Sequence, residues 1–121
     1  MLRDFDHVVL FCADTERSRQ WYEKVGFSYL RGYEGMHWFG LGGVQIMLHP
    51  AEAAPSGHRC ELYARVDDID AFFAHLKEQG LSPRDHQQPG IVLEAPVERP
   101  WGTREIELLD PDGHEWGFVQ V

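Results

Sequence analysis

The chain has 121 residues, 43% of them hydrophobic, and a formal net charge of −9 at pH 7. This length supports one domain with its own core. The acidic balance disfavours non-specific nucleic-acid binding, which needs a basic surface, and favours attraction of a cationic small molecule. Because no apolar window of about 18 residues occurs, no membrane partner is expected.

The first half of the chain predicts the order β-α-β-β-β. A helix is expected to begin at the N-cap Asp14, whose carboxylate can accept from free N–H groups, and to end before Gly26. Hairpin turns are expected at 34–35 and 42–43, where glycine permits a tight turn. The predicted strands are 7–12, 27–33, 36–41 and 44–49, and the predicted helix is 14–25.

The same order returns in the second half. The first module is predicted over about 1–50, a linker over about 50–58, and the second module over about 59–121, all within a single domain over 1–121. Polar or proline-flanked loops are expected over 82–90 and 96–102. The remaining predicted elements are a strand over 60–66, a helix from the N-cap Asp68 through Gln79, and strands over 91–95, 104–109 and 114–121.

The two predicted helices form a repeat. The segments 14–26 and 68–80 each begin with Asp and end with Gly, and they are offset by 54 residues. Such a duplication predicts two similar modules, and the seam between modules is a common place for a pocket. The sequence therefore predicts an α+β fold, with two βαβββ modules forming a curved mixed sheet around a cavity and the helices on the outer face.

Strand alternation predicts which side chains face this cavity. In the first strand Leu10 and Cys12 fit the helix side, which leaves His7, Val9 and Phe11 for the cavity. The same argument applied to the strands at 60–66 and 104–109 assigns these residues to the cavity: Glu61, Tyr63, Arg65, Glu105 and Glu107. A solvated strand face remains the alternative for Glu105 and Glu107.

The cysteines and the N-terminus bear on location. Cys12 and Cys60 lie in apolar runs without metal-site spacing, as is typical of free thiols in a reducing compartment. Residues 1–20 contain no long apolar stretch of the kind found in a secretory signal. The expected location is cytoplasmic.

Three motifs carry a resemblance to a known family. They are Asp6-His7-Val8-Val9, then Arg17-Ser18 before Trp21-Tyr22, and the tail Pro100-Trp-Gly-Thr-Arg-Glu105 followed by Asp110-Pro-Asp-Gly-His-Glu115. Together with the repeated modules, they resemble the vicinal oxygen chelate superfamily of glyoxalases, bleomycin-resistance proteins and dioxygenases. The tail is most similar to the bleomycin-resistance-like branch.

The resemblance implies two metal-ligand pairs in the enzymes, one pair per module. His7 falls on the first ligand position, and the repeat offset places Glu61 on its counterpart. The partner positions fall at Ile46 or Met47 and at Gly117, which cannot donate to a divalent metal. No catalytic residue and no metal cofactor are therefore predicted, and His7 and Glu61 are the expected ligands if a metal binds. Three other donors lie one or two residues away, namely Gln45, His49 and Glu115, and of these Gln45 and Glu115 would need a shifted alignment or a bulge.

The bleomycin-resistance branch implies a different function, in which a dimer sequesters a cationic drug by aromatic stacking and an acidic lining. The leading hypothesis is thus a non-catalytic homodimer that binds a cationic or aromatic small molecule in a groove at the module or dimer interface. A metal-dependent lyase, isomerase or dioxygenase is the alternative, and an accessory module without a ligand is the third possibility. The candidate ligand-binding residues are Trp38, Trp101, Tyr33, Tyr63, Glu61, Glu107 and His7.

Overall fold

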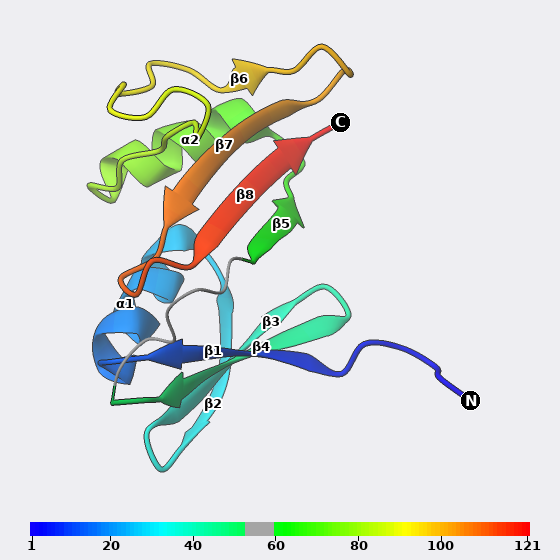
Figure 1. The fold of residues 1–121 in the computed structure, drawn as a ribbon, viewed down its shortest axis with the longest axis vertical. Helices are drawn as coiled ribbons and strands as arrows, with labels where there is room; N and C mark the ends of the chain where they lie inside the picture. Colours follow the sequence, from blue (N-terminus) through cyan, green and yellow to red (C-terminus); the bar gives the residue numbers. More distant parts are fainter. Residues whose placement is uncertain (53–59) are drawn as a thin grey trace. The chain divides into compact units, whose positions relative to one another are not determined.

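The chain divides into two compact units, Met1–His58 and Arg59–Val121. The computed structural model describes residues 1–52 and 60–121, so most of the predicted linker lies outside the described residues. Over these described residues, each unit contains one helix and four strands in the same order (Figure 1). Neither described helix is long and apolar enough to cross a membrane. The reading of 1–121 as one domain stays a prediction.

The first unit is a mixed four-stranded sheet with one helix. Its strands lie in the order β1-β4-β3-β2, with β1 parallel to β4 and the other pairs antiparallel. Strand β4 includes Pro50, which the sequence had placed in the linker. The elements are β1 His7–Cys12, α1 Thr15–Val25, β2 Ser28–Tyr33, β3 Met36–Leu41 and β4 Val44–Pro50.

The second unit has the same topology. Its strands lie in the order β5-β8-β7-β6, with β5 parallel to β8. The α+β class with two βαβββ units is therefore confirmed, as two four-stranded mixed sheets. The elements are β5 Glu61–Arg65, α2 Ile69–Glu78, β6 Val97–Glu98, β7 Arg104–Leu109 and β8 Glu115–Gln120.

Both helices begin in the same way. The N-cap Asp14 has φ −136° and ψ 96°, and its carboxylate accepts from the Arg17 N–H at 3.1 Å. The N-cap Asp68 has φ −133° and ψ 96°, and its carboxylate accepts from the Ala71 N–H at 3.1 Å. An extended N-cap whose side chain bonds the third residue satisfies a donor that the helix itself leaves free. The repeat in the sequence is therefore a repeat in local structure.

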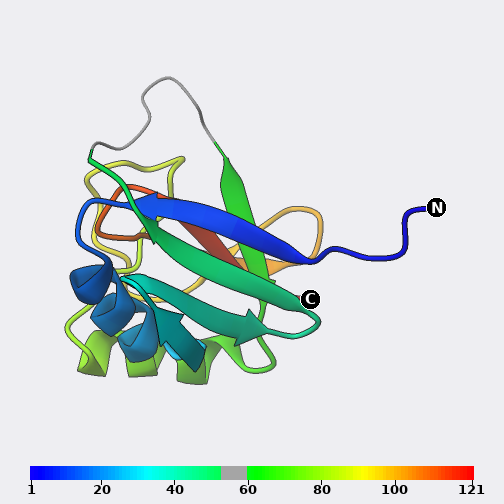
Figure 2. The ribbon, with the colours of Figure 1, turned by 90° about the horizontal axis from the view of Figure 1, so that it is seen from below.

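Helix α1 packs against strands β3 and β4 of its own sheet, and the core of the first unit lies between them (the ribbon is drawn in Figure 2). Tyr22 and Phe39 are fully buried, and their ring centroids lie 5.6 Å apart. Because side chains alternate along β3, burial of Phe39 on the helix side turns Trp38 to the opposite face. The helix-side residues Leu10 and Cys12 of β1 are also buried, as the strand period predicted.

The core of the second unit lies between α2 and strands β7 and β8 (Figure 1). Ile106 and Leu108 of β7 are buried on this side, and the rings of Phe72 and Phe118 lie 4.8 Å apart. This burial leaves the alternate residues of β5, β7 and β8 on the helix-free face.

The strand predicted over 91–95 is wrong. That segment forms no ladder, and the short strand β6 pairs with β7 at Val97 and Glu98 instead. Ile91 and Val92 are 54% and 70% exposed, and only Leu93 of this apolar run is buried in the core. Their β-branched character is typical of a strand, but a strand needs a partner edge, and the edge of β7 pairs with Val97 and with Arg84.

Candidate functional site

The helix-free face of the second unit carries an acidic row. Parallel pairing of β5 with β8 sets Glu61 beside Glu115 and Tyr63 beside Gly117. Antiparallel pairing of β8 with β7 then sets Gly117 beside Glu107. Partners on adjacent strands share a face. The structure therefore brings together three residues that the sequence predicted for the site: Glu61, Tyr63 and Glu107.

Tyr63 occupies the space that a side chain at position 117 would need. A Cβ placed on Gly117 would lie 2.3 Å from Tyr63 Cε2, so the glycine is what lets the ring lie flat on β8. Tyr63 is 48% exposed. Two effects raise the pKa of Tyr63: the larger is the partial burial of its hydroxyl, and the smaller is the negative charge of Glu61 and Glu107. The ring thus lies in a negative field with one side open to solvent.

Two glutamates of this face are buried, and the solvated-face alternative is wrong for them. Glu105 is 6% exposed and Glu107 is 7% exposed. Glu107 accepts from the His86 backbone N–H at 2.5 Å and also contacts His86 Nδ1. Glu105 accepts from the Thr103 hydroxyl at 2.7 Å. These polar partners satisfy the buried carboxylates, as buried charges require.

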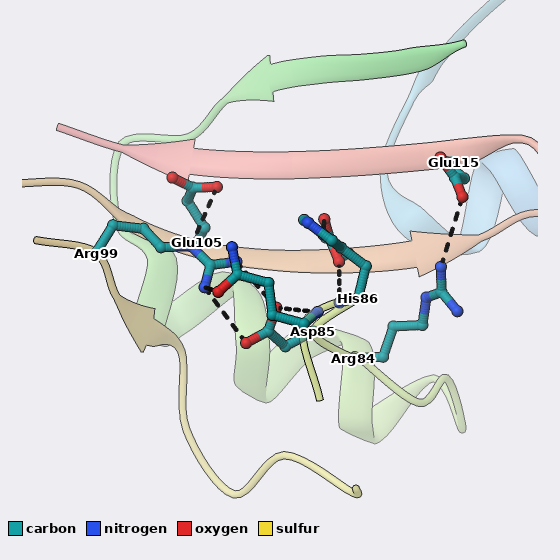
Figure 3. A network of polar contacts seen from close by, with 8 residues as sticks. Arg84, Asp85, His86, Arg99, Glu105 and Glu115 are labelled. Atoms are coloured by element: carbon teal, nitrogen blue, oxygen red, sulfur yellow. Dashed lines mark hydrogen bonds and ion pairs between the residues drawn. The ribbon is translucent and has the colours of Figure 1, made fainter. Parts of the chain in front are cut away.

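A buried arginine holds this region together (Figure 3). Arg99 donates to both carboxylate oxygens of Asp85, at 3.0 and 3.3 Å, and its Nε lies 3.8 Å from Glu105. The side chains of Arg99 and Asp85 are 6% and 1% exposed. Hydrogen bonds from Arg99 lower the pKa of Asp85, and Asp85 in turn raises the pKa of Arg99. Arg84, the residue before Asp85, makes a further ion pair: its Nη2 lies 3.9 Å from Glu115 Oε1.

Sequence reasoning missed Arg84, Asp85, His86 and Arg99. They lie in segments predicted as loops, and Asp85 is 14 residues from Arg99. No periodicity links such positions, so their pairing depends on the tertiary structure. The sequence offered one signal: the predicted loop 82–90 carries charged residues, and the later predicted strand 104–109 has glutamates at alternate positions.

The helix-free face of the first unit has a different character. Trp38 of β3 lies beside Met47 of β4, and the guanidinium of Arg31 lies over the indole at 4.7 Å from the ring centroid. Arg31 also donates to Gln45 Oε1 at 3.2 Å. His7 pairs with Gln45 in the parallel β1-β4 ladder. This face therefore presents an aromatic ring that the chain's own cation already covers.

Two predicted aromatic residues lie on exposed turns or strand ends. Tyr33, the last residue of β2, is 63% exposed, and Trp101 is 64% exposed. Trp101 lies in a closed turn, in which the Arg99 N–H donates to the Thr103 carbonyl at 2.8 Å. The indole is thus presented to solvent from a turn that the buried Arg99 anchors.

Comparisons with known proteins identify the family. Residues 4–118 match the model of the Glyoxalase/Bleomycin resistance protein/Dioxygenase superfamily. The chain belongs to this superfamily. A phosphoenolpyruvate carboxylase of Acinetobacter baumannii is 32% identical over 79 residues, which are 63% of this chain but 8% of that protein. The chain thus spans a small part of the length of this curated relative.

Several solved structures share the fold of this chain. A glyoxalase/bleomycin resistance protein/dioxygenase from Nocardioides has a TM-score of 0.75 at 20% identity, covering 99% of this chain and 84% of that one. A bleomycin resistance determinant encoded on the transposon Tn5 has a TM-score of 0.71 at 21% identity, covering 94% of each chain. A bleomycin-binding protein in complex with bleomycin has a TM-score of 0.70 at 20% identity, covering 100% of this chain and 99% of that one.

The superfamily's metal position in the second unit does not fit a metal in this chain. Glu61 offers a carboxylate there, but the resemblance places its partner at Gly117, where the ring of Tyr63 fills the space of a side chain. Within 1–52 and 60–121, one other group has ligand atoms close together: Asp85, His86 and Glu107 offer atoms within 4.8 Å of one another. Arg99 already donates to both oxygens of Asp85, and His86 Nδ1 already contacts Glu107.

The first-unit ligand position is similarly incomplete. His7 Nδ1 bonds to Asp6 Oδ2 at 2.6 Å. Ile46 is 2% exposed on the helix side, and Met47 lies on the face of His7 without a hard donor atom. Gln45 is the residue in register with His7, but its side-chain oxygen accepts from Arg31.

Proposed function

We propose that this protein binds a small cationic or aromatic molecule without chemical conversion, as a sequestering protein and as a homodimer. The observation that carries the proposal is the half-exposed ring of Tyr63, lying on Gly117 among glutamates of the second unit. An aromatic face with carboxylates around it attracts a planar cation by cation–π and charge interactions. The overall charge of −9 adds a long-range attraction.

Similarity to a bleomycin-binding protein supports the choice of ligand class. The proposed contacts in this chain are Tyr63, Glu61 and Glu107, with Trp101 as a solvent-exposed stacking ring. Tyr33, Trp38 and His7 remain proposed contacts on the first unit.

The test is a tryptophan fluorescence titration with metal-free bleomycin at low salt. We expect saturable quenching at one site per chain, because a stacked heteroaromatic ring perturbs an indole. Tyr63→Leu and Trp101→Phe should each weaken binding about tenfold, the equivalent of one good stacking contact. Trp21→Phe on α1 is the matched control and should leave the affinity unchanged. Light scattering of the same samples reports the dimer.

Two outcomes would contradict the proposal. Unchanged affinity in both Tyr63→Leu and Trp101→Phe would place the ligand elsewhere. Stoichiometric Ni, Zn, Mn or Fe in protein purified without chelator, lost in His7→Ala, would favour the metal-dependent alternative.

A further inference from the structure

We infer that the helix-free face of the first unit is a binding site for a small aromatic carboxylate, held by Arg31 over Trp38. This goes beyond the proposed function, because the ligand has the opposite charge, and because Trp38 and His7, named above as contacts of the cationic or aromatic ligand, are assigned to an anionic one. The site is defined by Val9, Trp38 and Met47 as its apolar floor, and by Arg31 and His7 as its polar end.

The first step of the argument is that an external cation meets competition at Trp38. The Arg31 guanidinium lies 4.7 Å from the centroid of the indole, which is the position that a cationic ligand would need. A cation arriving there would also face repulsion from Arg31. The ring is therefore a support for the chain's own cation.

The second step is that Arg31 is fixed and still has donors to offer. Two contacts hold the guanidinium: it lies over the indole of Trp38, and its Nη2 donates to Gln45 Oε1 at 3.2 Å. A guanidinium carries five N–H donors in a planar fork that matches a carboxylate. A fixed, exposed guanidinium loses little conformational freedom when it binds an anion.

The third step is that an apolar floor lies beside this cation. Ladder partners place Val9 next to Met47 and Met47 next to Trp38, and all three are half-buried on the helix-free face. Leu30 packs against Gly40 at the Arg31 end, where a Cβ on Gly40 would lie 3.5 Å from Leu30 Cδ2. An aromatic ring can cover this floor while its carboxylate pairs with Arg31.

His7 lies at the same end of this face. It lies beside Gln45 in the β1-β4 ladder, and Gln45 is the residue that Arg31 contacts. Its imidazole already bonds to the exposed Asp6 carboxylate through Nδ1, so Nε2 is the nitrogen that remains for a ligand.

The experiment compares three probes that share one ring: benzoate, neutral benzamide and benzamidinium. Binding is followed by the indole N–H signals in nitrogen-15 NMR spectra at constant ionic strength, and Trp38→Phe assigns the Trp38 signal. We expect benzoate to shift the Trp38 signal with saturation, and benzamide to bind at least about tenfold more weakly because it lacks the charge-assisted contact.

Arg31→Gln should weaken the affinity for benzoate about tenfold or more. Because Arg31 is exposed, the variant should still give the spectrum of a folded protein. Arg17→Gln, which removes an exposed charge from α1, is the matched control and should leave benzoate binding unchanged. Equal benzoate affinity in Arg31→Gln and the wild type, or equal affinity for benzoate and benzamide, would overturn the inference. Benzamidinium shifts that depend on Tyr63 report the proposed function separately, so either idea can fail alone.

Discussion

Replacing Arg99 with methionine is expected to destabilise the protein by about 3–5 kcal/mol, because it leaves buried carboxylates without their cation. The side chains of Arg99 and Asp85 are 6% and 1% exposed, and Glu105 beside them is equally buried. Because methionine keeps much of the volume of arginine, the loss of stability reports the removal of the charge. Urea unfolding followed by circular dichroism measures it.

The double variant Arg99→Met with Asp85→Asn should recover part of this loss, since one buried charge is removed with its partner. Arg65→Met, at an exposed position of β5, is the matched control and should change stability by less than about 0.5 kcal/mol. An Arg99→Met loss no larger than that of Arg65→Met would show that the ion pair does not hold segment 84–99 to the sheet.

The same ion pair predicts a dependence on pH. Hydrogen bonds from Arg99 lower the pKa of Asp85 below its ordinary value of 3.8. The unfolded chain therefore binds a proton more readily than the folded one, so this stabilisation is present above pH 3.8 and is lost as pH falls through the folded-state pKa. Acid unfolding of Asp85→Asn should lack this component. An identical stability difference between wild type and variant at about pH 6 and at about pH 2.5, on either side of the ordinary Asp pKa, would contradict the assignment.

Replacing Phe39 with alanine should cost about 3–5 kcal/mol, as expected for a large ring removed from a core. Phe39 is fully buried, and its ring lies 5.6 Å from Tyr22 and 5.3 Å from Tyr29. Its loss also releases β3 from α1, so the opposite face should lose its alignment of Trp38 with Arg31. Thermal and urea unfolding give the stability, and the Trp38 indole signal gives the alignment.

Trp38→Phe is the matched control on the neighbouring residue. Trp38 is half-buried on the helix-free face, so the smaller ring should cost less than about 1.5 kcal/mol. Equal losses for Phe39→Ala and Trp38→Phe would contradict the placement of the core on the helix side of β3.

The sequence by itself determined the features that repeat locally. Asp14 and Asp68 each cap a helix through a bond to the third residue, and that bond depends on neighbours within one turn. Strand period placed Tyr63 on the helix-free face and Ile106 in the core, because alternation is a property of the extended backbone. The two βαβββ units followed from the same local patterns, and the family followed from the resemblance of three sequence motifs.

Only the tertiary structure decided the partners of the charged side chains. Arg99 bonds to Asp85, and Arg31 bonds to Gln45. The two residues of each pair are 14 positions apart in the sequence, and no periodicity links them. It also decided that 91–95 is not a strand, since the edge of β7 is taken by Val97 and Arg84. Local propensity acts over a few residues, whereas ion pairs and strand edges depend on which distant segments the fold brings within reach of a hydrogen bond.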